Sequence, residues 1–393
     1  MAKDIFLIVA DGSTKEESVE NLKKKAQKIS EKNISMKLCS LLNEEVSGEK
    51  FRSCIVFSDA ENLRRQLADE NSISTCEHKE SGKRVFLFPG NGIYQKDMLR
   101  ILKNSHSYLK HIIEECENSD KTHVLENDDY LSRQLQICIS EIAVMKFWIY
   151  CGVVPDFIIG HSLGEYAVAT ATGVMSIENC IRMLNARGKI LNEKMNDFIM
   201  LAVYASYEKV SEVLGGNVDV SAYNCPELIT ITIESGALER IGSIFKECGI
   251  KYNRLPLSGG GHSRKLKSAE KEFKEAISDI QLNTAEIEII PTAVVGADKT
   301  ALYDIDYWTG HLVNPVCFMQ SFERLCGEDI RSMIDVGVSP VLLNMAMMNF
   351  RDLSVRWIPS IKSGRNYRTQ LIKSASQLYL SGENIIWKNL FEG

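Results

Sequence analysis

The chain is built around the segment Phe157-Ile158-Ile159-Gly160-His161-Ser162-Leu163-Gly164-Glu165. An apolar run long enough for a buried strand leads into Gly-x-Ser-x-Gly, and small residues then recur at helical spacing as far as Ala171. This pattern predicts a strand, a sharp turn and a helix, with Ser162 at the tip of the turn and the positive end of the helix dipole directed toward it. Glycine is required on both sides of the serine, because a side chain there would collide as the backbone doubles back. We therefore interpret Ser162 as a nucleophile and not as part of an ordinary surface turn.

Length and composition restrict the classes of protein to consider. With 393 residues, 45% hydrophobic and 25% charged, the chain is long enough for two or three globular domains with a large core. No apolar run approaches the roughly 18 residues of a membrane span, and no basic-then-apolar leader opens the chain. A net charge of −6 argues against a nucleic-acid surface. The 11 cysteines are scattered and form no C-x-x-C pair, which favours reduced thiols and no metal site. We expect a cytoplasmic protein without membrane or nucleic-acid partners.

The first eighty residues (1–80) are expected to form a small α/β subdomain. Strands are predicted at Asp4 to Val9 and at Cys54 to Phe57, each followed by an amphipathic helix. The first of these helices begins with a capping box at Ser13 or Thr14. The polar stretch from Asp69 to Arg84 is interpreted as a linker. The run of lysines at 23–25 is interpreted as the solvated face of a helix.

The ranges 81–197 and 258–352 are expected to form the central domain. It begins at the buried strand Val85 to Phe88, and strands alternating with helices predict a mostly parallel sheet with helices on both faces. The loop Pro89-Gly90-Asn91-Gly92 can present backbone N–H groups or the Asn91 amide to a ligand, and a simple tight turn explains it equally well. Between them, 198–257 follows a β-α-β-β-α-β order that predicts an inserted ferredoxin-like subdomain. A cleft between the subdomain and the sheet is a natural place for a site.

A serine nucleophile needs a base, and His262 is the candidate. It follows a strand and the flexible run Gly259-Gly260-Gly261, so its side chain can enter the cleft. An ordinary loop histidine is the alternative interpretation. His161 is adjacent to Ser162, but a neighbour in a tight turn usually faces away from the nucleophile.

Taken together, these motifs resemble those of the malonyl-CoA:acyl-carrier-protein transacylases and of the acyltransferase domains of polyketide synthases. That family pairs F-P-G-Q-G with G-H-S-x-G-E, followed by A-R-G, N-x-P, a histidine-serine pair, Y-W and N-P-V-x-F. The matching residues are Phe88-Pro89-Gly90-Asn91-Gly92, Gly160-His161-Ser162-Leu163-Gly164-Glu165, Ala186-Arg187-Gly188, Asn224-Cys225-Pro226, Gly261-His262-Ser263, Tyr307-Trp308 and Asn314-Pro315-Val316-Cys317-Phe318. The N-terminal unit resembles the linker between ketosynthase and acyltransferase, and 353–393 resembles the segment that wraps back. The resemblance implies an α/β-hydrolase-like core with a parallel sheet, an inserted ferredoxin-like subdomain and a small N-terminal α/β linker domain.

The resemblance also implies catalytic roles. Ser162 attacks a thioester and His262 takes its proton, while the backbone carbonyl of Asn314 orients the histidine in place of an acidic residue. The oxyanion hole consists of backbone N–H groups from Leu163 and from the Asn91 position.

Five further residues are implied to bind substrate: Arg187, Gln134, His161, Gly260 and Gly261. Arg187 matches the arginine that pairs with the free carboxylate of malonyl groups, which a planar guanidinium clamps with two charge-assisted hydrogen bonds. Without the resemblance, a helix-surface arginine would be the expected interpretation. Gln134 matches a pocket glutamine of the family.

Three positions depart from the family pattern. Asn91 stands where glutamine is usual, and Phe198 occupies a usual glycine position. Gly259-Gly260-Gly261 replaces the H-A-F or Y-A-S that precedes the histidine, which is expected to remove apolar wall and to admit a larger or more polar malonyl derivative. In the family, leucine at the position of Leu163 is commoner in malonyl-selective members. The glycine run therefore favours a larger donor, whereas Leu163 favours malonyl.

We predict an acyltransferase that loads a malonyl-type unit from malonyl-CoA onto the phosphopantetheine thiol of an acyl carrier protein, in polyketide or hybrid polyketide-peptide biosynthesis. CoA or carrier thioesters serve as substrates and no cofactor is bound. The partners are an acyl carrier protein and a ketosynthase or other synthase modules; a free-standing protein and an excised domain both fit. Alternatives are transfer of amino-, hydroxy- or methoxymalonyl units from a carrier, an editing thioesterase and a non-catalytic docking module. Arg264, Lys265 and Lys267 are expected to receive the acidic carrier, with a solvated basic patch as the alternative.

Overall fold

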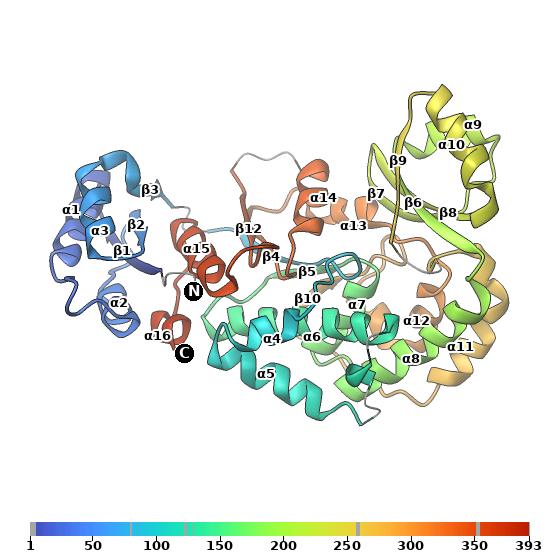
Figure 1. Ribbon diagram of the computed structural model, residues 1–393, viewed down its shortest axis with the longest axis horizontal. Helices are drawn as coiled ribbons and strands as arrows, with labels where there is room; N and C mark the ends of the chain where they lie inside the picture. Colours follow the sequence, from blue (N-terminus) through green and yellow to red (C-terminus); the bar gives the residue numbers. More distant parts are fainter. Residues whose placement is uncertain are drawn as a thin grey trace.

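The computed structural model describes residues 5–78, 81–121, 124–127, 129–256, 260–350 and 354–392. Three sheets follow one another along an elongated molecule, with a small N-terminal unit at one end and a projecting subdomain at the other (Figure 1). Asp4, Ser258 and Gly259, which enter the sequence predictions, lie outside the described residues. Among the residues that are described, no helix is both long enough and apolar enough to span a membrane.

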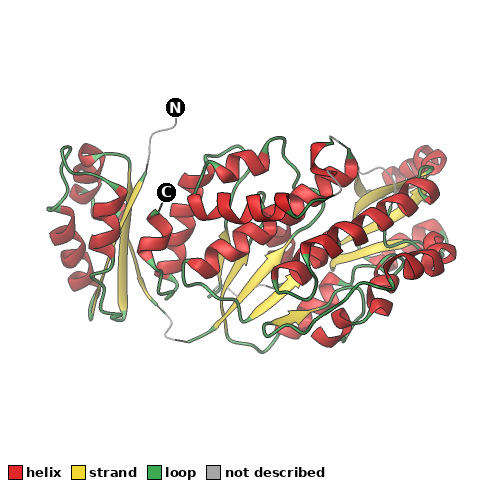
Figure 2. Cartoon of the chain, turned by 90° about the horizontal axis from the view of Figure 1, so that it is seen from below, coloured by secondary structure: helices red, strands yellow, loops and turns green. Residues whose placement is uncertain are grey.

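The N-terminal unit is a three-stranded antiparallel sheet of order β1-β2-β3. Its strands are β1 (Phe6–Gly12), β2 (Phe51–Phe57) and β3 (Ser74–Glu77), and its helices are α1 (Lys15–Ala26), α2 (Met36–Asn43) and α3 (Ala60–Ala68). The helices cover the outer face of the sheet (Figure 2). Thr14 caps α1, since its hydroxyl accepts the Glu17 N–H at 3.1 Å, so the second of the two predicted capping residues is the one used.

Two predictions for this unit are wrong. The predicted linker contains β3, an edge strand of polar residues whose weak alternation hides it in the sequence; Thr75 is bonded to Ser53 at 3.0 Å between hydroxyls. Lys25 does not belong to a solvated face. It is buried, and its ammonium donates to the carbonyls of Val9 and Glu45, each at 3.1 Å.

The central sheet has five parallel strands in the order β10-β5-β4-β11-β12. The strands are β4 (Lys83–Phe88), β5 (Phe157–Gly160), β10 (Glu288–Ile290), β11 (Ile330–Asp335) and β12 (Arg356–Pro359). Successive side chains of β4 point to opposite faces: Phe86 and Phe88 join the larger core, whereas Val85 and Leu87 join a second core on the other face. This confirms the parallel sheet buried on both faces.

Helices surround the central sheet and connect it to the N-terminal unit. They are α4 (Met98–Lys103), α5 (Ser107–Asn118), α6 (Tyr130–Tyr150), α7 (Leu163–Ala171), α8 (Ile177–Lys194), α11 (Glu270–Ile277), α12 (Ile305–His311), α13 (Phe318–Phe322), α14 (Val341–Asn349), α15 (Tyr367–Leu380) and α16 (Trp387–Phe391). α15 packs against both β12 and β2, and so joins the two sheets (Figure 1). Because β12 belongs to the central sheet, the border expected between 352 and 353 does not separate the core from the C-terminal segment.

The inserted subdomain lies between α8 and α11. Its elements are β6 (Phe198–Tyr204), α9 (Tyr207–Leu214), β7 (Val220–Cys225), β8 (Leu228–Glu234), α10 (Leu238–Glu247) and β9 (Lys251–Arg254). The antiparallel strand order β7-β8-β6-β9 confirms the predicted ferredoxin-like arrangement. Ile199, Leu201 and Val203 of β6 face the helices in a separate core, so the alternate residues of this strand face away from α9 and α10.

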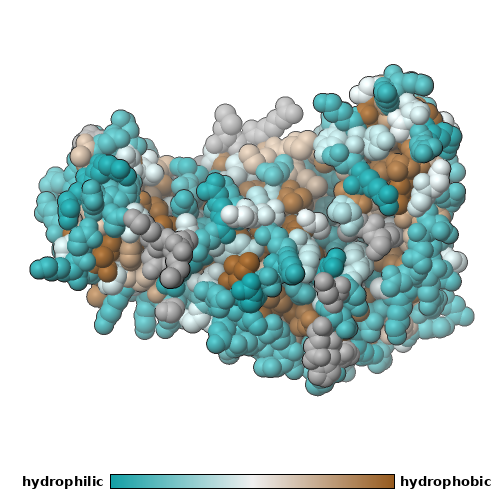
Figure 3. Space-filling view, viewed as in Figure 1, coloured by the Kyte–Doolittle hydropathy of each residue, from teal (hydrophilic) through white to brown (hydrophobic). Residues whose placement is uncertain are grey.

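Short 3-10 turns complete the chain: η1 (Glu70–Ser72), η2 (Val124–Glu126), η3 (Ser235–Ala237), η4 (Arg264–Ala269), η5 (Lys299–Tyr303) and η6 (Glu323–Leu325). The surface is mostly hydrophilic, and apolar colour gathers over α14 and along the subdomain sheet (Figure 3). Met347 and Met348 of α14 are 46% and 44% exposed, and Tyr204 of β6 is 48% exposed.

Candidate active site

Ser162 occupies a strained turn between β5 and α7. Its φ of 53° and ψ of −115° are unusual for a residue with a side chain, a conformation that costs about 1–3 kcal/mol and persists only where the surroundings enforce it. A Cβ on Gly160 would lie 2.7 Å from the Glu165 nitrogen, and one on Gly164 would collide with the Phe88 carbonyl. The strand, turn and helix predicted from Gly-x-Ser-x-Gly are therefore present. Both glycines are needed because a side chain at either position would collide with the backbone.

His262 lies against the serine. Its Nε2 is 2.7 Å from Ser162 Oγ, and its Nδ1 is 2.9 Å from the backbone oxygen of Asn314. Because Nδ1–H donates to that carbonyl, Nε2 is the nitrogen that can accept the serine proton. Burial, followed by the nearby His311 and the charge of Arg187, lowers the pKa of His262 well below its usual value. The imidazole is therefore neutral at pH 7, as a general base must be.

Arg187 of α8 is almost fully buried beside this pair, with 2% of its surface exposed. Its Nε and Nη1 have no hydrogen-bond partner in the described part of the chain. An unpaired charge away from water is costly, so a guanidinium left in this state indicates a site for an anionic group that comes from outside.

The glycines before His262 do not act as predicted. A Cβ on Gly261 would press against Nη2 of Arg187, and one on Gly260 would lie 2.7 Å from Oγ1 of Thr232 and 3.3 Å from Met200. The space is already filled by these side chains, so the glycines allow close packing of the backbone and do not enlarge a pocket. The expectation of a removed apolar wall is wrong at 260 and 261, and Gly259 lies outside the described residues.

Ser162, His262 and Arg187 open into one cavity of about 340 Å³. The helix-free face of the subdomain sheet covers it through Met200, Ala202 and Tyr204 of β6. The other lining residues are Pro89, Asn91, Gly92, Tyr130, His161, Ser221, Ala222, Asn224, Leu228, Thr230, Asn253, Leu255, Pro256, Gly261, Val316, Val341, Leu342 and Met345. The predicted cleft between subdomain and sheet is therefore present.

Several predicted residues lie behind the cavity wall. Gln134, Leu163, Asn314 and Gly260 do not line it. The Gln134 side chain donates to the hydroxyl of Tyr130 at 3.1 Å, so that glutamine reaches the cavity only through the tyrosine. Leu163 is the first residue of α7, and the N–H groups of a first helical turn have no partner within the helix.

His161 lines the cavity, but its side chain bonds to Asn224 and not to Ser162, so it is not the general base. Its Nε2 is 2.8 Å from Oδ1 of Asn224, whose Nδ2 in turn donates to Thr230 at 3.2 Å. Burial lowers the pKa of His161, so the neutral ring donates to the amide oxygen. The contact ties the serine turn to β7 of the subdomain.

Glu141 is a positioning residue that the sequence reading missed. It lies in the apolar helix α6, where it accepts the Gly90 N–H at 2.7 Å and so holds the loop that carries Asn91. Gly90, with φ of 66°, packs directly on the serine turn, because a Cβ there would lie 2.5 Å from the Gly164 nitrogen. Burial raises the pKa of Glu141 well above its usual value. The sequence signal for this role is a single glutamate within a mostly apolar helical stretch.

The basic residues after His262 are engaged locally. Arg264 contacts Asp219 at 3.5 Å and Lys267 contacts Glu270 at 2.8 Å, while the Lys265 ammonium lies 5.8 Å from the centre of the Phe198 ring. They do not line the cavity. Arg264, Lys265 and Lys267 therefore lie beside the inserted subdomain and outside the cavity.

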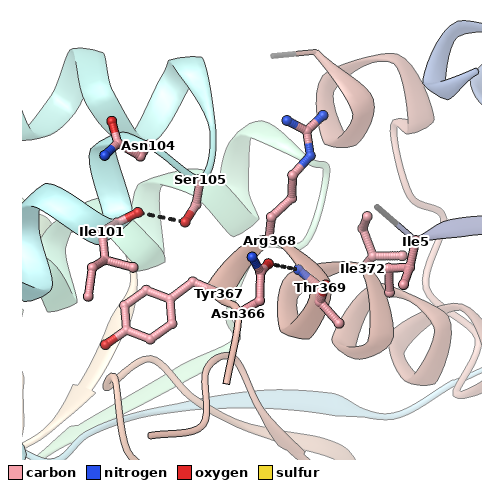
Figure 4. A pocket seen from close by; sticks show the side chains of 9 residues that line it. All are labelled: Ile5, Ile101, Asn104, Ser105, Asn366, Tyr367, Arg368, Thr369 and Ile372. Carbon is pink, nitrogen blue, oxygen red and sulfur yellow. Dashed lines mark hydrogen bonds between the residues drawn. The ribbon is translucent and has the colours of Figure 1, made fainter. Parts of the chain in front are cut away.

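A second hollow, of about 300 Å³ between α4 and α15, provides a contrast (Figure 4). Ser105 donates to the Ile101 carbonyl at 2.7 Å, and the Thr369 N–H donates to Asn366 at 2.9 Å, so these polar groups serve the helices themselves. Arg368 is the charged side chain at its edge. None of the residues lining this hollow pairs a nucleophile with a base, so we assign it no chemistry.

A serine on a strained turn, next to a neutral histidine and at the start of a helix, is typical of enzymes that move acyl groups. The family model described as "Acyl transferase domain" matches residues 85–383. The chain belongs to this family and is an acyltransferase.

Curated relatives are much longer proteins. The orsellinic acid synthase armB of Armillaria mellea is 25% identical over 374 residues, which cover 86% of this chain and 17% of the synthase. The spectinabilin polyketide synthase system protein NorB of Streptomyces orinoci is 25% identical over 338 residues, covering 79% of this chain and 15% of NorB. The chain thus spans less than a fifth of the length of these relatives.

Solved structures share the fold. The acyltransferase domain from module 8 of the salinomycin polyketide synthase superposes with a TM-score of 0.85 at 18% identity, covering 98% of both chains. FabD from Acinetobacter baumannii gives a TM-score of 0.64 at 23% identity and covers 76% of this chain and 99% of its own. The N-terminal unit thus has a counterpart in the first structure.

Proposed function

We propose that the chain transfers a malonyl-type acyl group from a thioester donor to the phosphopantetheine thiol of an acyl carrier protein, through an acyl-enzyme on Ser162. The observation that carries this proposal is the position of Arg187. A buried guanidinium, whose Nε and Nη1 have no partner among the described residues, opens into the same cavity as the Ser162–His262 pair. An acyl group that ends in a carboxylate satisfies both sites at once, because its thioester lies at the serine while its far end meets the arginine.

The reaction proceeds by two exchanges at one carbonyl carbon. His262 Nε2 takes the Ser162 proton as the serine oxygen bonds to the thioester carbon, and the N–H groups of Leu163 and of the Asn91 position stabilise the oxyanion. The C–S bond then breaks, and the departing sulfur receives the proton from His262. The carrier thiol gives its proton to the same nitrogen as its sulfur bonds to the ester carbon. The C–O bond to Ser162 then breaks, and His262 returns the proton to the serine oxygen.

We propose malonyl-CoA as the donor. The reason for expecting a larger donor was the glycine run, but Arg187, Thr232 and Met200 occupy the space at Gly260 and Gly261. Leu163 after the serine supports the same choice. Transfer of amino-, hydroxy- or methoxymalonyl units from a carrier is then the less favoured form of the same function.

The partners and the setting belong to this proposal. The curated relatives are polyketide synthases, which supports an acyl carrier protein as acceptor and a ketosynthase or other synthase modules as neighbours. CoA and carrier thioesters are substrates, so the reaction needs no bound cofactor. We propose that it takes place in the cytoplasm.

Mass spectrometry of the intact protein after incubation with an equal mixture of malonyl-, methylmalonyl- and acetyl-CoA tests the proposal. We expect one malonyl group on Ser162, none in Ser162→Ala, and loading slowed by about 10²–10⁴ in His262→Ala. Adding the carrier should discharge the acyl-enzyme faster than water does. Acylation of Ser162→Ala would contradict the proposed nucleophile, and faster discharge by water would indicate a thioesterase.

A further inference from the structure

The base is held in a strained backbone conformation. His262 has a φ of 58°, in the left-handed region that a residue with a side chain rarely adopts. Such a conformation persists only where the surroundings enforce it. The His262 N–H donates to the Leu312 carbonyl at 2.9 Å, and its Nδ1 donates to the Asn314 carbonyl at 2.9 Å. These two contacts fix the residue itself, and a further set fixes the chain that follows it.

Ser263 directly follows the base and is fully buried. Its hydroxyl donates to Oδ2 of Asp219, and the N–H of Arg264 donates to Oδ1 of the same carboxylate at 3.2 Å. The Ser263 oxygen also accepts the Lys265 N–H at 3.2 Å and so caps η4. A carboxylate suits this place because each of its oxygens accepts a separate donor. Asp219 therefore holds both residues that come after His262.

Asp219 belongs to the sheet of the inserted subdomain. It directly precedes β7, and its carbonyl accepts the Thr232 N–H of β8 at 2.8 Å. Its side chain is buried. Thr232 also packs against the chain before the base, since a Cβ on Gly260 would lie 2.7 Å from its Oγ1. The chain on both sides of His262 is thus held by bonded neighbours in one sheet.

We propose that Asp219 is a positioning residue for the general base. Its carboxylate fixes the backbone at Ser263 and Arg264. This in turn keeps His262 in the strained conformation that places Nε2 2.7 Å from Ser162 Oγ. Neither Asp219 nor Ser263 lines the cavity, so both act through His262. The subdomain that covers the cavity thereby also aligns the base with the nucleophile.

The sequence reading missed this role because Asp219 stands 44 positions from Ser263 in the chain. The inference rests on the proposed function, in which His262 is the base that activates Ser162. Base positioning and carboxylate binding are separable, because a displaced base slows every acyl donor, whereas a lost carboxylate partner slows only donors that carry a carboxylate.

The experiment removes the two ends of the buried contact separately and together. Ser263→Ala loses the hydroxyl donor, Asp219→Asn replaces the charged acceptor by a neutral side chain of similar size, and a third variant carries both changes. Asp197→Asn, at an exposed aspartate directly before β6 of the same subdomain, is the matched control. Single-turnover acylation of Ser162 is measured over a range of malonyl-CoA and acetyl-CoA concentrations, so that each donor gives a maximal rate and a half-saturating concentration.

We expect each single variant to lower the maximal rate about 10- to 100-fold, as for a displaced catalytic group, with the half-saturating concentration unchanged. The factor should be the same for both donors. The double variant should be no slower than the slower single variant, because both changes break one contact. Asp197→Asn should equal the parent.

Three results would overturn the proposal: a full maximal rate in Ser263→Ala or Asp219→Asn, losses that multiply in the double variant, or a loss confined to malonyl-CoA. If Asp219→Asn does not fold, Ser263→Ala decides, since a fall with both donors supports the proposal and an unchanged rate refutes it. The parent protein separates this inference from the function on which it rests. A parent not acylated at Ser162 refutes the proposed function, whereas an acylated parent with a fully active Ser263→Ala refutes the role of Asp219 alone.

Discussion

Two arginines of this chain are buried equally and are used in opposite ways. Arg52 of β2 is 3% exposed and Arg187 of α8 is 2% exposed. The Arg52 guanidinium donates to the carbonyls of Tyr379 and Glu383 at 3.0 and 2.6 Å and to Asn384 at 2.9 Å. Arg187 has unpartnered Nε and Nη1 atoms beside the nucleophile. Within the described residues Arg52 lacks a partner at Nε, whereas Arg187 lacks one at both Nε and Nη1. At similar burial, this difference in pairing distinguishes a structural charge from one that awaits a ligand.

The partners of Arg52 explain how the N-terminal unit is attached. Its guanidinium also lies over the Tyr379 ring, 4.7 Å from the centroid, so one side chain of β2 joins the C-terminal segment at several points. Glu383 extends the contact, because its carboxylate pairs with Arg331 of β11 and approaches Arg84 at 3.7 Å. A buried charge network thereby connects the N-terminal sheet to the central one.

The largest expected effect is the change in the free energy of unfolding when Arg52 and Arg187 are replaced separately. Arg52→Leu should destabilise the fold by about 3–5 kcal/mol, because it leaves buried acceptors without their partner. Arg187→Leu removes a buried charge whose Nε and Nη1 have no partner among the described residues, so stability should be unchanged or higher. Thermal unfolding of both variants checks this, with acylation of Ser162 at 25 °C in Arg52→Leu as the control. Equal losses of stability would contradict the distinction between the two arginines.

A smaller effect is expected at Gly261, where the backbone packs against the unpartnered guanidinium. In Gly261→Ala the new Cβ must displace Arg187, at a cost of about 1–3 kcal/mol typical of overpacking. We expect the half-saturating concentration of malonyl-CoA to rise about tenfold, and acetyl-CoA to be affected less. Steady-state kinetics with both donors measure this. An identical change for the two donors would mean that Gly261 shapes the fold and not the carboxylate site.

The smallest effect concerns pH and the contact of α16 with α5. The His106 Nδ1 accepts the Tyr108 N–H at 3.1 Å and its Nε2 donates to the Asn389 carbonyl at 2.9 Å, so the folded state requires the neutral ring. Burial lowers its pKa, so the unfolded state binds more protons below its own pKa of about 6.5. Stability from this contact should be complete above pH 6.5 and decline as the pH falls below it.

Unfolding in urea at pH 5.5 and 7.5 measures this pH dependence. The parent should lose more stability at the lower pH than His106→Gln, since the amide does not titrate. Equal pH dependence in the two proteins would assign the loss to other groups.

The features that the sequence predicted well are local ones. The serine turn follows from glycines within four residues of Ser162, and the ferredoxin-like subdomain follows from periodicity alone. His262 was found because the glycines next to it suggested freedom to reach the cleft. In each case the residues that carry the signal are neighbours along the chain.

The features that were mispredicted depend on residues distant in sequence. Lys25 is buried because the carbonyls of Val9 and Glu45 converge on it, and a lysine run gives no sign of that. Gly260 and Gly261 are small because Thr232 and Arg187 fill the space beside them. The His311 ring lies 4.8 Å from that of His262 because α12 packs against α7. These positions depend on tertiary packing. Neither the composition of the sequence nor the spacing of its residues predicts them.

The proposed function depends most on Arg187, which is expected to bind the carboxylate of the transferred group. The measurement is the ratio of malonyl to acetyl acylation rates on Ser162, in the parent and in Arg187→Ala. We predict that malonyl acylation falls about 10²–10³-fold in the variant, since a charge-assisted pair loses one partner, while acetyl acylation is unchanged or faster. The ratio should fall by the same factor. An unchanged ratio would contradict the claim and make Arg187 a structural residue.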